Sequence, residues 1–135
     1  KEKIGRFNAE VYKESVADED FNPGRYEKLI ELCSVCSHII VVLMVRGDKP
    51  RMPEMEDLLS VGCAAQNLHL MATALGVSGY WSTGGATYKE AAKAYFGLGE
   101  NDKMLGYFYL GHYEGPWPKG RRNSEITEKT TWIRD

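Results

Sequence analysis

The sequence predicts one domain in which helices and strands follow one another along the chain, ended by an extended arm. Segments with apolar residues at helical spacing alternate with short apolar runs that have the length of strands. Glycine and proline separate these segments. The last stretch, residues 113–135, holds aromatic residues but has no clear period. The predicted order is therefore two helices, then three strands separated by two helices, then the arm.

Length and charge restrict the class of protein. The chain has 135 residues and a mass of 15.2 kDa, which fits one domain with a single core. A net charge of -2 argues against a nucleic-acid partner, because phosphate-binding surfaces normally carry a basic excess. No apolar run approaches the roughly 20 residues of a membrane span, and the N-terminus has no apolar signal region. We expect neither nucleic acid nor membrane as a partner.

The cysteines predict the compartment. Cys33, Cys36 and Cys63 are an odd number in a chain without a signal peptide, which indicates reduced thiols and a cytoplasmic protein. Cys33 and Cys36 form a C-x-x-C pair, but a pair at the C-terminal end of a predicted helix has no help from the helix dipole. Core cysteines are therefore favoured over a redox pair. The histidines and Cys63 are scattered, and we expect no metal site.

The first third of the chain predicts two helices and a strand. Apolar residues at near-helical spacing predict a helix over residues 3–16, and Asn22, Pro23 and Gly24 predict the turn that follows. A second helix is expected over residues 25–37. The run HIIVVLMV, residues 38–45, lacks polar alternation, which is typical of a strand covered on both faces. A central position in the sheet suits it best.

A long helix is predicted to start near Pro53, where three acidic residues favour a helix N-terminus. Its apolar residues form one stripe, but Cys63, Leu70 and Met71 cover other faces too. We therefore expect this helix to be buried nearly all round. Gly76 is a plausible left-handed stop for it.

The second half of the chain predicts two further strands with a helix between them. The run VSGYWST, residues 77–83, is the second strand. Thr87 and Glu90 match a capping box, so a helix is expected over residues 87–96, stopped by Gly97. The run MLGYFYL, residues 104–110, is the third strand. Three strands are few for an independent sheet, which suggests that the chain is incomplete or completed by a partner.

The loop after the second strand is the most informative cluster for a ligand. Trp81, Ser82, Thr83, Gly84 and Gly85 would place backbone N–H and hydroxyl groups beside an apolar ring, where a planar ligand takes hydrogen bonds. A plain strand end with a glycine turn explains the same residues equally well.

A second cluster is basic. Arg121 and Arg122, with Lys119, could clamp a phosphate, although a solvated basic turn is the simpler interpretation.

Several motifs together resemble the nitroreductase family. They are SVGCAAQNLHLMATALGVSGYWSTG from residue 60 to 84, the short helix after it, DKMLGYFYLG from residue 102 to 111, and the basic element near Arg121. The similarity is closer to the small, minimal-type members and covers residues 1–123. It is specific because several motifs occur in the right order and at the right spacing.

The resemblance implies an α+β, nitroreductase-like fold with a central sheet and helices on both of its faces. It also implies a homodimer built largely by the long central helix, with one FMN in each of two clefts between the subunits. The implied reaction passes hydride from NAD(P)H to FMN and then to a small-molecule acceptor such as a nitroaromatic or a quinone. No catalytic residue of the chain is implied, because the flavin carries the chemistry.

Carried over residue by residue, Trp81, Ser82 and Thr83 match the loop that lies along the flavin, with Gly84 beside it. Arg121 matches a C-terminal phosphate contact, with Arg122 as its neighbour. Residues 71–76 match a stretch sometimes associated with the nicotinamide nucleotide.

The chain also departs from the family. The Arg-rich R-R-S segment that grips the FMN phosphate, and the A-P-S and N-x-Q-P-W runs, do not occur in it. Residues 1–135 are therefore expected to be a single, N-terminally incomplete nitroreductase-like domain.

The leading hypothesis is an NAD(P)H-dependent FMN oxidoreductase. Two alternatives stay open: a flavin-free remnant that acts as a dimerisation or binding module, and a thiol redox protein that uses Cys33 and Cys36. No motif names the acceptor or distinguishes NADH from NADPH.

Overall fold

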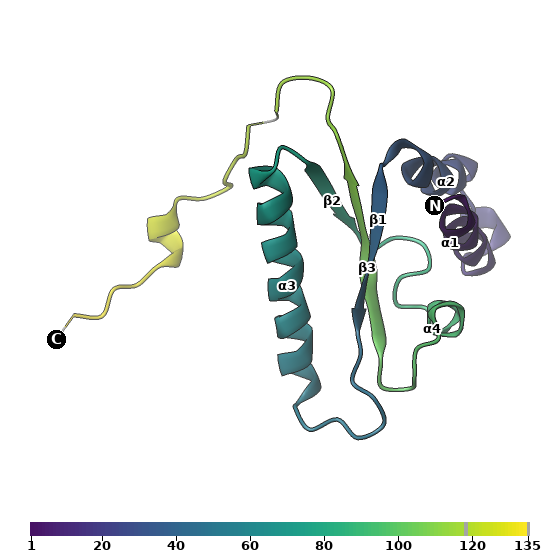
Figure 1. Cartoon of the computed structure of the whole chain (residues 1–135), viewed down its shortest axis with the longest axis horizontal. Coiled ribbons are helices and arrows are strands. Elements are labelled where there is room, and N and C mark those ends of the chain that lie inside the picture. The colour runs from purple at the N-terminus through teal and green to yellow at the C-terminus, as the bar shows by residue number, and fades with distance from the viewer. Residues whose placement is uncertain (118, 135) are drawn as a thin grey trace.

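The structure is a computed structural model that describes residues 1–117 and 119–134; Pro118 and Asp135 of the predicted arm lie outside the described residues. A three-stranded sheet stands between one long helix and a group of shorter ones (Figure 1). The elements in chain order are α1 (Glu2–Glu14), η1 (Asp18–Asp20), α2 (Pro23–Val35), β1 (His38–Met44), α3 (Glu54–Ala74), β2 (Ser78–Ser82), α4 (Glu90–Phe96), β3 (Lys103–Gly111) and η2 (Ile126–Lys129).

The sheet has the strand order β1-β3-β2, and both pairings are antiparallel. Phe108 at the middle of β3 lies between Ile40 of β1 and Trp81 of β2. The expectation that residues 38–45 form the central strand is therefore wrong, since β3 holds that position. A run of apolar residues indicates cover on both faces, but it does not say which strand has neighbours on both edges.

Helices cover both faces of the sheet, as predicted. The first core lies where α1, α2 and α4 meet the sheet, and it is built around Cys33, Ala92, Met104, Tyr107 and Tyr109. The second core lies under α3, where Leu58, Val61 and Leu68 pack on Val42, Met44, Leu105 and Phe108. Tyr107 and Tyr109 of β3 thus reach the first core and Phe108 reaches the second, as a central strand requires. A shift of register opposite Val42 and Leu43 places Met104 in the same core as Tyr107. The α+β class is confirmed.

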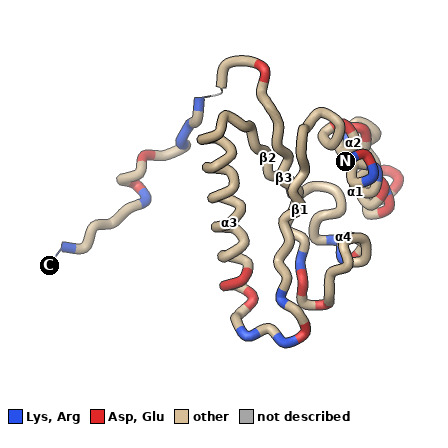
Figure 2. Tube along the Cα trace, viewed as in Figure 1, with Lys and Arg blue, Asp and Glu red and all other residues tan. Residues whose placement is uncertain are grey.

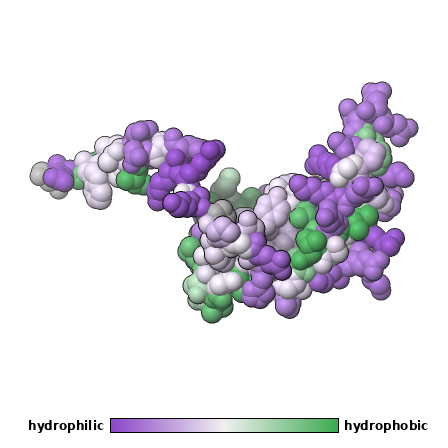
Figure 3. Space-filling model, turned by 90° about the horizontal axis from the view of Figure 1, so that it is seen from above, coloured by the Kyte–Doolittle hydropathy of each residue, from purple (hydrophilic) through white to green (hydrophobic). Residues whose placement is uncertain are grey.

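The prediction that the long helix is buried nearly all round is wrong within the chain. Only Ala65 and Ala72 of α3 are buried, while its outward side exposes the large apolar residues Met55, Leu59, Leu70 and Met71, and its C-cap Leu75 is exposed too. Leu70 and Met71 are 59% and 60% exposed. Figure 2 shows that α3 carries no charged residue beyond its acidic first turns. Figure 3 shows hydrophobic residues gathered at the end of the body from which the arm extends. Within residues 1–117 and 119–134, no segment covers this face.

Two predicted helix stops are confirmed, and one predicted start is wrong. Gly76 after α3 has φ +71°, and Gly97 after α4 has φ +66°, so both adopt the left-handed conformation that glycine allows. Helix α4 begins at Glu90 rather than at Thr87, and the capping box does not form. The Thr87 hydroxyl instead donates to the carbonyl of Gly84 at 3.1 Å, so it closes the preceding turn.

A buried asparagine joins α1 to the loop after β2. The Ala86 N–H donates to Asn8 Oδ1 at 2.6 Å, and Asn8 is only 1% exposed. The same amide lies against Gly85, where an added Cβ would come within 2.0 Å of Asn8 Oδ1 at a φ of +64°. The loop therefore keeps its shape because Gly85 has no side chain and Asn8 supplies an acceptor.

A second polar link holds the far end of the sheet. The buried Asp102 carboxylate accepts hydrogen bonds from the N–H groups of Arg46, Gly47 and Gly99 at 2.6, 3.2 and 2.9 Å. These bonds hold the pKa of Asp102 below its ordinary value. The Arg46 side chain continues the link to α3 through Asp57 Oδ2 at 2.7 Å.

The arm leaves the body after β3 and passes on the α3 side (Figure 1). Apart from the single turn of η2, its described residues form no regular element. Its aromatic residues Tyr113, Trp117 and Trp132 are exposed, so the arm does not bury them against its own body. Among the described residues, no helix is long and apolar enough to cross a membrane.

Replacing Asn8 with Ala is expected to lower the free energy of unfolding by about 1–3 kcal/mol, because it leaves the buried Ala86 N–H without an acceptor. Gly85→Ala is expected to destabilise the fold as well, because the added Cβ would clash with Asn8 and because the backbone at this residue is left-handed. Urea denaturation measures both changes. Gly120→Ala, which adds a Cβ in open space, is the control and should leave the midpoint unchanged. Equal midpoints for all the variants would contradict this account.

The lowered pKa of Asp102 predicts how the free energy of unfolding depends on pH. Because its pKa is lower in the folded chain than in the unfolded chain, its contribution is complete above the ordinary pKa of about 4 and is lost as pH falls through the lower folded value. Asp102→Asn should therefore be less stable at pH 7 and lose less stability on acidification than the parent chain. Urea midpoints between pH 7 and pH 2 measure this. Parallel pH profiles would show that the carboxylate is not held by these bonds.

Candidate functional site

Trp81 is fixed at the end of β2 by one hydrogen bond and one glycine. Its indole Nε1–H donates to the carbonyl of Leu105 at 3.1 Å. The ring lies against Gly106 of β3, where an added Cβ would come within 2.7 Å of Nε1. The indole is therefore oriented by its neighbours, while 38% of the residue stays exposed. An aromatic ring that is held in place but partly open is suited to cover a planar ligand.

The loop that follows β2 has donors that the chain itself hardly uses. The Gly84 N–H makes only a long contact with Ser82 Oγ, at 3.5 Å, and Thr83 is exposed. The carbonyl of Gly84, by contrast, is occupied by Thr87. Asn8 fixes the next two residues of the loop, so its open part is held at both ends. This arrangement can offer an N–H and two hydroxyl groups to a ligand without reordering the backbone.

The predicted residues Trp81, Ser82, Thr83 and Gly84 come together around one hollow of about 320 Å³. Its other wall is α2, which contributes Arg25, Lys28, Leu29 and Leu32. The sequence reasoning missed Arg25 and Lys28. A signal was available, because residues 25, 28, 29 and 32 share one helical face, but nothing in the sequence shows which loop that face meets.

The structure does not bring Arg121 and Arg122 to this hollow. Both are exposed on the arm, and neither lines the hollow. The arm runs on the α3 side of the body, whereas the loop lies on the α4 side (Figures 1 and 2). Within one chain, the predicted flavin loop and the predicted phosphate contact are therefore separate.

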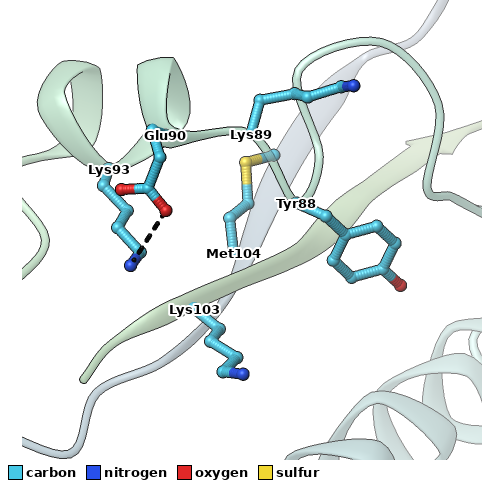
Figure 4. A pocket seen from close by; sticks show the side chains of 6 residues that line it. All are labelled: Tyr88, Lys89, Glu90, Lys93, Lys103 and Met104. Atoms are coloured by element: carbon cyan, nitrogen blue, oxygen red, sulfur yellow. Dashed lines mark ion pairs between the residues drawn. The ribbon is translucent and has the colours of Figure 1, made fainter. Parts of the chain in front are cut away.

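A second hollow, of about 170 Å³, lies beyond the loop and collects three lysines, Lys89, Lys93 and Lys103 (Figure 4). Two of the ammonium groups are already paired. Lys93 Nζ lies 3.2 Å from Glu90 and Lys103 Nζ lies 2.6 Å from Glu54. The side chain of Lys89 points away from these two. The lysines therefore do not converge on one point.

The cysteines of the C-x-x-C pair are core residues. Cys33 and Cys36 are both buried near the C-terminal end of α2, and burial raises the pKa of the Cys33 thiol. The Cys33 thiol lies 4.0 Å from the Tyr109 hydroxyl, and burial also raises the pKa of Tyr107 and Tyr109. A buried, protonated thiol is a poor nucleophile, which disfavours the thiol redox hypothesis. In the part of the chain that the structure describes, no cluster of His, Cys, Asp or Glu could hold a metal ion.

The fold and this loop define a class of protein, and the comparisons agree with it. The model of the nitroreductase family matches residues 10–112, which is most of the chain. The chain belongs to the nitroreductase family.

Two curated relatives are 34% identical to the chain over 95 residues. They are the proteins named "Putative NAD(P)H nitroreductase YdjA" in Escherichia coli strain K12 and in Escherichia coli O157:H7. The match covers 70% of this chain and 50% of each relative, so the chain spans about half the length of the curated relatives it matches.

A solved structure has the same fold. The crystal structure of a nitroreductase-like family protein from Bacillus cereus superposes with a TM-score of 0.67 at 22% identity, over 96% of this chain and 66% of that chain. The predicted nitroreductase-like fold is therefore confirmed.

Proposed function

We propose that the chain is part of an NAD(P)H-dependent FMN oxidoreductase that reduces a small-molecule acceptor such as a nitroaromatic or a quinone. Membership of the nitroreductase family and the NAD(P)H nitroreductase names of its relatives support this proposal. The observation that carries it is the loop after β2, where a weakly engaged Gly84 N–H and an oriented Trp81 face one hollow.

The residues of this loop fit the ring system of FMN. An isoalloxazine is planar, has hydrogen-bond acceptors at its edge and needs apolar cover, and Gly84, Thr83 and Trp81 offer these partners. When bound, FMN supplies the centre that accepts and donates hydride. The chain's own residues would hold the ring edge, cover it and exclude water from one side.

A single chain offers fewer contacts to the phosphate end of FMN than to its ring system. Arg121 and Arg122 lie on an arm that leaves the body, so their proposed role as phosphate contacts requires the arm to reach a site outside its own loop. A second subunit is the simplest way to provide that site. If the arm does not reach one, the flavin-free dimerisation module is the function that remains.

We propose a homodimer built on α3. The outward side of this helix carries Met55, Leu59, Cys63 and Leu70 at a spacing that places them on one face, and small residues beside them allow close approach. A soluble chain rarely leaves such an apolar face open to water. The exposed aromatic residues of the arm also need a surface, and the partner would supply one.

Localisation in the cytoplasm remains a prediction, based on the odd number of cysteines and the free state of all three.

The flavin site predicts the effect of one added methyl group. At Gly84 an added Cβ would make only ordinary contacts, 3.8 Å from Ser82 Oγ and 4.0 Å from Leu29, so Gly84→Ala should fold normally. The methyl group would stand in the hollow, and FMN affinity should fall about tenfold. Fluorescence titration of FMN into the whole protein measures this.

Ala17→Val, which adds two methyl groups at an exposed residue with extended backbone that does not line the hollow, is the control for the flavin titration. A whole protein that stays colourless and takes up no FMN would rule out the proposed function.

The dimer predicts that one charge on α3 separates the subunits. Leu70→Arg would bury an unpaired charge in the proposed interface, so dimerisation should weaken by at least tenfold. Val35→Arg, at the end of α2, introduces the same charge at a residue that is 70% exposed and should leave the dimer intact. Sedimentation velocity over a range of concentrations compares them. An unchanged dimer in Leu70→Arg would show that α3 is not its interface.

A further inference from the structure

The α2 wall of the hollow carries positive charge that no acidic residue balances. Arg25 and Lys28 lie one turn apart on α2, and no Asp or Glu lines the hollow with them. Among residues 1–117 and 119–134, neither side chain forms an ion pair with a carboxylate. The Arg25 guanidinium rests 4.8 Å from the centre of the Tyr12 ring, which limits its freedom. The lysines of the neighbouring hollow differ, since Lys93 and Lys103 already have partners (Figure 4).

The hollow continues along β2 and becomes apolar. A third hollow, of about 210 Å³, shares Leu32 and Tyr80 with the hollow at the loop, so these two form one groove between α2 and β2. Beyond these two residues, the lining of the groove includes Val35, Tyr109, Leu110 and Tyr113. Tyr80 stacks on Tyr109, with 6.3 Å between the ring centres, and presents a flat floor. The groove is therefore cationic at the loop end and apolar and aromatic at the other end.

We propose that this groove binds an organic anion, with its acid group at Arg25 and Lys28 and its aromatic body along Leu32 and Tyr80. A carboxylate or sulfonate would take the two cations as partners, and the rings would remove apolar surface from water. The groove adjoins Ser82, Thr83 and Gly84, so an aromatic anion lying in it is beside the proposed flavin site, and we assign it as the electron-accepting co-substrate. This assignment of the co-substrate rests on the proposed function, whereas the binding of the anion does not.

A nitrobenzoate is a suitable probe because its reduction balances with the proposed electron donor. NAD(P)H gives one hydride and the solvent gives one proton, so the nitro group loses one oxygen as water and becomes a nitroso group, while NAD(P)H becomes NAD(P)+. The carboxylate takes no part in this step. Methyl 4-nitrobenzoate has the same nitro group and ring without the charge, and it is the matched neutral probe.

The first experiment measures binding without turnover. 4-Nitrobenzoate and its methyl ester are titrated into the whole protein, with the amide signals of Ser82, Thr83 and Gly84 followed by NMR. In the double variant Arg25→Gln, Lys28→Gln, the dissociation constant of the carboxylate should rise about fivefold and that of the ester should not change. The difference should shrink as salt is added. Lys13→Gln removes an exposed cation outside the groove and should behave as the parent protein.

The second experiment separates the acceptor from the nucleotide. In the flavin-loaded protein, the double variant should raise the KM for 4-nitrobenzoate and leave the KM for the ester, NADH and NADPH unchanged. A rise confined to NADH or NADPH would assign the cations to the nucleotide and overturn the proposal. Equal losses for acid and ester, or equal losses in Lys13→Gln, would overturn it too. If the protein takes up no flavin, the proposed function fails, but the titration still decides whether the groove binds the anion.

Discussion

Strand β3 must satisfy partners on both edges and both faces, and the rest of the structure is arranged around that requirement. Its backbone pairs with β1 on one side and β2 on the other. Every residue from Met104 to Tyr109 is buried. Because its side chains reach two cores, α3 and the group of α1, α2 and α4 must lie on opposite faces. The position of Trp81 follows from the same strand, since Leu105 accepts its N–H and Gly106 makes room for its ring.

Much of the fold could be predicted from the sequence because local signals and tertiary contacts agree. The apolar spacing of the helices, the glycine stops at Gly76 and Gly97 and the aromatic run of β3 all describe what is observed. The failures have a common cause. The central place of β3, the exposed side of α3 and the absent capping box at Thr87 depend on which segments meet in space, and no residue's neighbours in sequence report that.

The same distinction between local signals and tertiary contacts applies to the residues of the site. Trp81, Ser82, Thr83 and Gly84 are consecutive, so a sequence pattern can find them, and the structure gathers them around one hollow. Arg25 and Lys28 lie more than 50 residues away in the chain and become part of the hollow only when α2 packs beside β2. Arg121 and Arg122 do not line this hollow in their own chain, and their assignment as phosphate contacts, which comes from the resemblance in sequence, stays a prediction.

The hydrogen bond between Asn8 and Ala86 has a consequence for the energetics of the loop. It spans 78 positions of the chain and connects the first helix to the loop that we propose holds the flavin. Because free energies of binding and of local ordering are reciprocal, a ligand that fixes the loop also favours the docked position of α1. A change in how firmly α1 packs is passed back as a change in affinity. Helix α1, none of whose residues lines the hollow, thus belongs to the same cooperative unit as the proposed site.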